Sequence, residues 1–213
     1  MAPRDYDMRE RERAVLETRR RILDATLALH TEKGIFGTSW QDIAERADVS
    51  VGTVYRHFPS LAELVPACGE LLFERTAPPS PEDASATMSD LTDPVERLER
   101  AGMTLFSFYE RAGAHIDSDA RERELPEVRE WEEYLRDTVK AFIREALRGQ
   151  RAHASTLELV SAFFDFRTYG ALRTRGITPE RAAREVAAMV AAWLGIEHRA
   201  SEGSRPRRRG RSS

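Results

Sequence analysis

The segment ADVSVGTVYRHF, residues 47–58, contains one short helix with a clear start and a clear end. Ser50 is a good N-terminal cap, because its hydroxyl can accept a hydrogen bond from a free amide of the first turn. Pro59 stops the helix, since the residue before a proline avoids the helical region. The segment therefore predicts a helix from Val51 to His57.

A second short helix precedes this one. It is expected to open at Thr38, where Thr38-Ser-Trp-Gln41 fits a capping box, and to end at the turn Asp48-Val49. Two short helices joined by a tight turn with an apolar residue form the helix-turn-helix pattern. The second helix of that motif enters the major groove of DNA with its N-terminal residues at the base edges. Gly52 costs helix stability, up to about 1 kcal/mol relative to alanine, but lets the backbone approach a phosphate closely.

The helices on either side of this motif have their own signals. A first helix is expected from about Val15 to Lys33, because apolar residues recur there at helical spacing, and Gly34 should end it. Ser60-Leu-Ala-Glu63 resembles another capping box and should open a fourth helix that reaches residue 75 or 76. The three helices before residue 60 would then form one small domain.

The rest of the chain is also expected to be helical. Residues 77–94 are rich in Pro, Ser and Asp and are interpreted as a linker or mobile loop. Longer helices are predicted over residues 94–113, 126–148, 157–173 and 179–194. The predicted fold is all-α, with a helix-turn-helix domain at 1–63, a helical bundle at 64–198 and a disordered basic tail at 199–213.

Composition narrows the class of protein. The chain has 213 residues and a net charge of -3, which argues against a uniformly basic nucleic-acid coat but allows a local basic face. The single cysteine, Cys68, cannot form an internal disulfide and fits a reducing, cytoplasmic compartment. It is read either as a small apolar residue or as a redox sensor. No apolar run is long enough to cross a membrane, and residues 1–21 do not resemble a signal peptide.

Common enzyme motifs are missing from the sequence. It has no phosphate-binding G-x-x-x-x-G-K-[ST] loop, no H-E-x-x-H pair, no paired cysteines for a metal and no strand to carry a nucleotide-binding glycine loop. The five histidines are scattered. We therefore expect a protein that is not an enzyme and has no catalytic residues, metal site or cofactor.

Residues 19–65 carry RILDA, EKG, TS, DIAERA and VS-x-GT-x-Y-x-HF in that order. This ordered set resembles the DNA-binding domain of the TetR family of bacterial transcriptional repressors. The resemblance and the local pattern together imply contacts with double-stranded operator DNA from Thr38, Ser39, Ser50, Val51, Gly52, Thr53, Tyr55, Arg56 and His57. Val54 and Phe58 are expected in the core.

Two positions depart from the family pattern. His30 stands where phenylalanine is usual and should face the core, as a packed, hydrogen-bonded histidine or as a pH sensor. Leu61 stands where lysine usually contacts a phosphate. That contact is expected either from the arginine-rich tail, which could equally serve solubility, or from arginines near the first helix, namely Arg11, Arg13, Arg19, Arg20 and Arg21.

In this family the larger domain forms a dimer and holds a small ligand, so the resemblance implies both here. The expected interface is a four-helix bundle made by helices 157–173 and 179–194 of two copies. A two-fold dimer places its two recognition helices about 34 Å apart, one turn of DNA. The candidate contacts are Phe163, Phe164, Tyr169, Leu172, Val186, Met189, Val190 and Trp193.

A ligand pocket is expected between the helices that begin at Pro94, Pro126 and Leu157. Its candidate residues are Met103, Phe106, Tyr109, Trp131, Tyr134, Thr138, Phe163, Phe166 and Arg167. Their aromatic content favours an apolar or aromatic effector, although each could instead be plain core packing. The helix with the internal Pro66 joins the two domains, and its shift on ligand binding is expected to move the recognition helices out of register.

The sequence thus predicts a bacterial, cytoplasmic, homodimeric transcriptional regulator that a small effector releases from its operator. Because most members of the resembled family are repressors, repression is the expected action. An activator is not excluded by the residues. The rival interpretation is an architectural DNA-binding protein without an effector. An empty pocket in the larger domain favours the regulator, and a solid core favours the rival.

Overall fold

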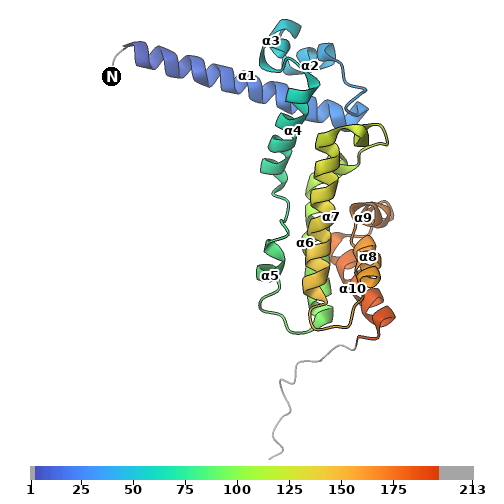
Figure 1. Ribbon diagram of the computed structural model, residues 1–213. Helices are drawn as coiled ribbons and strands as arrows, with labels where there is room; N and C mark the ends of the chain where they lie inside the picture. The colour runs from blue at the N-terminus through green and yellow to red at the C-terminus, as the bar shows by residue number, and fades with distance from the viewer. Residues whose placement is uncertain (1–2, 197–213) are drawn as a thin grey trace, which may run out of the picture.

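The computed structural model describes residues 3–196, and these are entirely helical apart from turns and loops. Figure 1 shows a small group of helices at one end, from which a long helix projects, and a taller bundle below it. The helix α4, Leu61–Thr76, runs from the small group toward the bundle. The predicted all-α fold with two parts is confirmed. The predicted basic tail lies outside the described residues.

The small group consists of α1, Pro3–Lys33, α2, Trp40–Ala47, and α3, Val51–His57. Its core is closed by side chains that are almost fully buried, including Ile22, Leu29, Ile43, Val54, Phe58 and Leu64. α1 begins twelve residues before the predicted start at Val15. The residues before Val15 are mostly arginine, glutamate and other good helix formers, so the helix continues there without any apolar stripe.

The start of α2 is one residue later than predicted. Ser39, not Thr38, is the cap: its hydroxyl accepts from the amide of Asp42 at 3.1 Å, and the Asp42 carboxylate accepts from the Ser39 amide at 3.0 Å. The Thr38 hydroxyl instead donates to the carbonyl of Gly34 at 2.8 Å. The capping box is present, but aspartate closes it rather than Gln41.

The turn after α2 and the cap of α3 are formed as predicted, whereas the predicted cap of α4 is not. Asp48 ends α2 in the left-handed conformation, with φ of 53°, as expected of a tight turn. Ser50 caps α3 through the amide of Thr53 at 3.1 Å. Ser60 precedes α4 but makes no side-chain capping bond, so the predicted box with Glu63 is not formed.

The first half of α4 belongs to the core of the small group. Leu64, Ala67, Cys68 and Leu71 are buried there together with residues of α1 and α2. Burial raises the pKa of the Cys68 thiol to about 12, so the thiolate that redox chemistry requires is scarce at neutral pH. Of the two interpretations of Cys68, the structure supports the small apolar residue.

Residues 77–94 are not the mobile linker that their composition predicts. They contain the short helix α5, Asp83–Thr87, and bury Ala84 and Met88 in the core of the bundle. The Pro79 carbonyl accepts a hydrogen bond from the hydroxyl of Tyr134 at 3.1 Å. The composition of this segment correctly predicted that it forms no long helix. The apolar residues that anchor it are too few and too widely spaced to give a periodic signal.

The bundle is built around α6, Pro94–Ala112, and α7, Pro126–Ala146, with two short 3-10 helices between them, Gly113–Ile116 (η1) and Glu122–Glu124 (η2). α10, Pro179–Leu194, packs closely along α6. A Cβ on Gly102 of α6 would lie 3.0 Å from the Cα of Ala183, so only glycine allows this approach. The starts of α6, α7 and α10 at a proline are as predicted.

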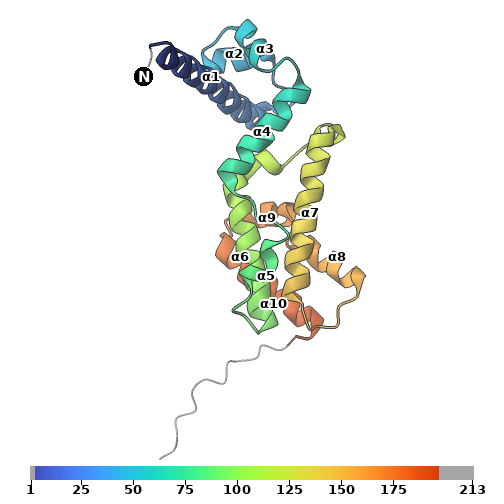
Figure 2. The ribbon, with the colours of Figure 1, turned by 60° about the vertical axis from the view of Figure 1, so that its left-hand side comes forward.

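The predicted single helix over 157–173 is wrong. The chain forms α8, Ala154–Phe163, then breaks, and continues as α9, Phe166–Arg173. Asp165 causes the break, because its carboxylate accepts from the amide of Arg167 at 2.8 Å and caps the second helix. Figure 2 shows α8 and α9 as separate, differently directed helices beside α7 and α6.

Candidate DNA-binding surface and cavity

The helix α3 is fixed to the small domain from one side only. Val54 and Phe58 are fully buried, as predicted, and the guanidinium of Arg19 lies 4.3 Å from the centre of the Phe58 ring. Ser50 caps the helix start, and its hydroxyl lies 2.9 Å from that of Thr53. The opposite side of α3 therefore points away from the protein with its backbone held in place.

That outer side carries residues predicted to contact DNA. Gly52, Tyr55 and Arg56 are exposed, and Val51, Thr53 and His57 are partly exposed. Tyr55 is 45% exposed although its ring packs, tilted by 30°, against Trp40 of α2 with ring centres 4.9 Å apart. Arg56 forms no ion pair within residues 3–196. A free guanidinium next to exposed hydroxyl groups is the combination that hydrogen-bonds phosphates and base edges.

Packing inside the chain does not require glycine at position 52. A Cβ there would meet only the Ser50 hydroxyl oxygen, at 3.9 Å. Gly52 therefore lowers the stability of the helix relative to alanine, and no steric contact within the protein requires it. This agrees with an external partner that approaches the α3 backbone closely.

Thr38 and Ser39, the other two candidates, have hydroxyl groups that already serve the fold. The Thr38 hydroxyl donates to Gly34, and the Ser39 hydroxyl donates to Asp42 at 2.6 Å. That bond from Ser39, followed by one from Lys33, holds the pKa of the Asp42 carboxyl well below its usual range. Both residues nevertheless border the exposed start of α2, close to the Trp40–Tyr55 pair.

The arginines of α1 divide into engaged and free groups. Arg20 pairs with Glu74 at 2.9 Å, and Arg19 covers Phe58. Arg11, Arg13 and Arg21 are exposed and have no ion pair in the described part of the chain. The free arginines could supply the positive charge that Leu61, partly buried against the core, does not.

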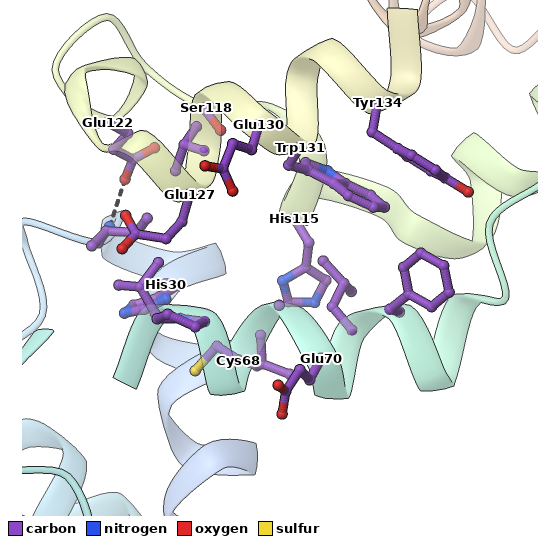
Figure 3. A pocket seen from close by; sticks show the side chains of 18 of the residues that line it. His30, Cys68, Glu70, His115, Ser118, Glu122, Glu127, Glu130, Trp131 and Tyr134 are labelled. Atoms are coloured by element: carbon purple, nitrogen blue, oxygen red, sulfur yellow. Dashed lines mark hydrogen bonds between the residues drawn. The ribbon is translucent and has the colours of Figure 1, made fainter. Parts of the chain in front are cut away.

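A cavity of about 710 Å³ lies between the two parts of the molecule. It is bordered by α4, by the start of α7, by the segment 115–122 and by the end of α1 (Figure 3). Trp131 and Tyr134 are the two predicted pocket residues that line it. The cavity is thus displaced toward the DNA-binding part from the predicted place between α6, α7 and the α8–α9 region.

The seven other pocket candidates are placed elsewhere. Phe106, Tyr109 and Thr138 are buried in the core of the bundle, where the Phe106 ring stacks on Tyr169 with centres 5.1 Å apart. Met103, Phe163 and Phe166 pack against that core from its edge. Arg167 pairs with Glu132 at 3.2 Å. Helical spacing identified the apolar candidates as inward-facing, but it does not distinguish a packed core from the wall of a cavity, and Arg167 is exposed.

Three contacts connect the rim of the cavity to the small domain. The Glu122 carboxylate accepts from the amide of Ile35 at 2.5 Å. The hydroxyl of Thr31 lies 3.0 Å from Nδ1 of His115. The guanidinium of Arg121 lies over the ring of Phe36, 4.1 Å from its centre. Sequence reasoning missed this link, because the acidic run around Glu122 has the composition of a solvated helix face.

His30 lies at the cavity rather than in a closed core. Burial lowers its pKa to about 4, an effect that Glu122 partly opposes and His115 reinforces. Its Nε2 is buried without a hydrogen-bond partner, so the expected hydrogen-bonded packed histidine is not what the structure shows. The imidazole is neutral at pH 7 and one of its nitrogens is free for a ligand.

The predicted dimer contacts are buried, partly buried or exposed in the single chain. Phe164, Tyr169, Val186 and Val190 are buried inside the chain's own core. Phe163 and Leu172 are partly buried. Met189 and Trp193 of α10 are 48% and 55% exposed, and Leu159 of α8 is 49% exposed. Among the large apolar side chains of α8 and α10, these three are exposed and are therefore available for contact with a second copy.

Residues 3–196 contain neither a metal-ion cluster nor a membrane-crossing helix. No group of histidine, cysteine, aspartate and glutamate side chains there could hold a metal ion. None of the helices in that part of the chain is both long and apolar enough to cross a membrane.

Comparison with known proteins identifies the small domain. Residues 22–68 match the sequence profile of bacterial regulatory proteins of the tetR family. The transcriptional repressor KstR of Rhodococcus jostii is 41% identical over 83 residues, which are 39% of this chain and 36% of KstR. The transcriptional regulator TtgR of Pseudomonas putida is 32% identical over 112 residues, 53% of this chain and 49% of TtgR.

The larger domain is matched at the level of the fold. The structure of the multidrug binding protein EbrR, in complex with imidazole, aligns with a TM-score of 0.53 and 25% identity over 81% of this chain and 93% of EbrR. The sequence alignments, by contrast, span about a third to a half of the curated relatives' length.

Proposed function

Residues 22–68 form a tetR-family DNA-binding domain, and from this premise we propose that the chain is a ligand-responsive transcriptional repressor. The observation that carries the proposal is the outer side of α3. It presents Thr53, Tyr55 and Arg56 on a helix whose other side is fixed by buried Val54 and Phe58. Regulators of this kind bind DNA and catalyse no reaction.

In the proposed complex α3 lies in the major groove. The free amides at its start and the nearby hydroxyl groups contact phosphates, and Arg56 reaches base edges. Gly52 keeps the helix start open to the DNA backbone. Arg11, Arg13 and Arg21 add attraction to flanking phosphates, which makes operator affinity strongly dependent on salt.

Binding as a homodimer is part of the proposal. One seven-residue helix reads too few base pairs to select an operator, whereas a two-fold dimer reads two half-sites. The exposed apolar residues Met189 and Trp193 of α10 and Leu159 of α8 support an interface through the last helices. Two copies joined there would leave both α3 helices, at the other end of each molecule, free for DNA.

The cavity supports regulation by an effector over the rival architectural role. A protein that only shapes DNA has no need of a cavity of about 710 Å³. Because the cavity lies against both α4 and the Glu122–Ile35 contact, a ligand that prefers one arrangement of the domains would shift operator affinity. A coupling of about 1–3 kcal/mol corresponds to a change of about 5- to 150-fold.

Repression is proposed because KstR, whose sequence matches this chain over 83 residues, is a transcriptional repressor. A bacterial repressor acts on chromosomal DNA, so the proposed location is the cytoplasm. The test is fluorescence anisotropy with labelled DNA from upstream of the gene itself and from neighbouring promoters, combined with a reporter assay in cells. Specific binding that Arg56→Ala weakens at least about tenfold, with reporter expression rising on deletion of the gene, is expected. Reporter expression that falls on deletion contradicts repression, and an absence of binding contradicts the whole proposal.

A further inference from the structure

One wall of the cavity is aromatic. Trp131 and Tyr134 of α7 stack with ring centres 5.6 Å apart and planes inclined by 15°. Phe73 of α4 faces both of them, at 6.1 Å and 6.0 Å. Phe73 is 46% exposed, which is unusual for a large apolar ring inside a cleft between two helices. The wall therefore offers ring faces and edges to a ligand with an apolar body.

The charged side chains that line the cavity are all acidic, if neutral His30 and His115 are set aside. Six carboxylates and no lysine or arginine are among the described lining residues. Glu74 is neutralised by Arg20, and Glu122 is occupied by the amides of Ile35 and Asp119. Glu127 and Glu130, at the start of α7, have no hydrogen-bond or ion-pair partner within residues 3–196.

Neighbouring arginines do not compensate these two charges. Arg123 is paired with Glu132 at 2.9 Å, and Arg121 covers Phe36. Figure 3 shows Glu127 and Glu130 on the same side of the cavity as Trp131, with Glu127 directed toward His30. Negative charge thus lies next to the aromatic wall without a counter-ion from residues 3–196.

Two buried nitrogen atoms add a polar element. Nε1 of Trp131 and Nε2 of His30 belong to lining residues and have no hydrogen-bond partner. Unpaired buried polar atoms are unfavourable, so a ligand that also carries a hydrogen-bond acceptor gains affinity here, while the preference for charge and apolar shape can be tested without one. His30 is held neutral by its lowered pKa and does not repel positive charge.

We propose that this cavity binds a lipophilic organic cation, with its apolar body against Phe73, Trp131 and Tyr134 and its charge next to Glu127 and Glu130. A cation is attracted by aromatic faces and by carboxylates, here the partly buried Glu127 and the exposed Glu130 at the edge of the cavity. An anion of the same shape meets only like charge. A bare metal ion is not the ligand, because no group in the described residues could hold one. That the cation is an effector rests on the proposed function, whereas its binding does not.

The test compares two ions of nearly equal size and shape but opposite charge. Isothermal titration calorimetry of the full-length protein is performed with tetraphenylphosphonium and with tetraphenylborate at about 0.15 M salt, where surface charges are screened within about 8 Å. The expected result is an affinity at least about tenfold higher for the phosphonium. Equal affinities, a preference for the borate, or no phosphonium binding at about 1 mM would overturn the proposal.

Variants locate the charge. The double variant Glu127→Gln with Glu130→Gln should weaken phosphonium binding by about tenfold, in line with the loss of two nearby charges, and should not weaken borate binding. Glu133→Gln is the matched control, because Glu133 is an exposed residue of the same helix that does not line the cavity. An unchanged phosphonium affinity in the double variant, or an equal loss in the control, contradicts the assignment. Thermal melts of each variant confirm that it is folded.

Operator binding is measured separately by anisotropy, with and without tetraphenylphosphonium. A chain that binds DNA but shows no preference for the cation contradicts this inference alone. A chain that binds the cation but no DNA contradicts the proposed function and leaves the cation site in place. Binding of both, with operator affinity lowered at least about fivefold by the cation, supports the two together.

Discussion

The carboxylate of Glu122 accepts a hydrogen bond from the backbone amide of Ile35, 87 positions earlier in the chain, at 2.5 Å. Glu122 lies between α6 and α7 of the bundle, and Ile35 lies in the connection between α1 and α2 of the DNA-binding domain. The second oxygen of the same carboxylate accepts from the amide of Asp119 at 3.1 Å. One buried side chain therefore links the rim of the cavity to the start of the helix-turn-helix.

Replacement of Glu122 by alanine is expected to lower the free energy of unfolding by about 1–3 kcal/mol, because two backbone amides lose their acceptor. It should also reduce the effect of any cavity ligand on operator affinity, since the link between the domains is cut. Chemical denaturation and anisotropy measure the two effects. Glu124→Ala, at an exposed position of the same 3-10 helix, is the control and should change neither. A fully stable Glu122→Ala protein would contradict the structural role of the contact.

Two glycines give opposite predictions for the same substitution. Gly34 has φ of +75°, and a Cβ there would lie 2.8 Å from Oε1 of Glu122, so Gly34→Ala should destabilise by about 1–3 kcal/mol. Gly69 lies inside α4 with no atom within 4 Å of a Cβ, so Gly69→Ala should stabilise by up to about 1 kcal/mol. At this chain length 1 kcal/mol corresponds to about 2–4 °C in Tm. Shifts of the same sign in both variants would contradict the geometry.

Residues on the two sides of α3 should separate binding from stability. Arg56→Ala should reduce operator affinity at least about tenfold and leave Tm within experimental error, because Arg56 is exposed and has no partner in the described chain. Tyr55→Ala should abolish operator binding. It should also lower the free energy of unfolding by about 0.5–1.5 kcal/mol, because the contact between Tyr55 and Trp40 is lost. Val54→Ala, on the buried side, is the contrasting variant and should lower Tm. Normal operator binding by Arg56→Ala and Tyr55→Ala would argue against α3 as the reading helix.

Acid should destabilise the protein through His30. The imidazole has an ordinary pKa of 6.5 and a pKa of about 4 when folded, so the unfolded chain takes up the proton first. The free energy of unfolding is therefore unaffected above about pH 7 and falls between about pH 6.5 and 4, by up to about 3 kcal/mol from this group. Urea denaturation across that range measures the fall. His30→Phe should show a smaller fall than the parent protein, and His153→Phe, at an exposed site, should not.

Dimerisation is tested at α10. Trp193→Asp places a charge on a side chain that is 55% exposed in the single chain, and it should convert the dimer to monomers without unfolding the bundle. Size-exclusion chromatography with light scattering gives the molar mass, and circular dichroism checks the helix content. A mass that stays at twice 24.2 kDa would exclude this face as the interface.

The sequence by itself predicted the features that depend on neighbouring residues. Ser50 as a cap, prolines at the first positions of α6, α7 and α10, and the turn at Asp48 are each determined within one turn of chain. The order of these signals also identified the DNA-binding domain. The same local rules failed by one residue at Thr38, because two adjacent hydroxyl groups compete for the cap and only the position of Gly34 decides between them.

The position of the ligand cavity, by contrast, could not be predicted from neighbouring residues. Phe106 and Trp131 have the same pattern in the sequence, an aromatic residue on the inner face of an amphipathic helix, yet one is fully buried and the other lines the cavity. The difference arises from what each ring meets: Phe106 stacks on Phe164 and Tyr169, whereas Trp131 faces the exposed Phe73 of α4, and no local signal encodes these partners. The sequence alone therefore determined the helices, their caps and the DNA-binding motif, since these rest on contacts between residues close in the chain. Only the tertiary structure decided the position of the cavity, its negative charge and the contact between Glu122 and Ile35, because each depends on residues brought together from distant segments.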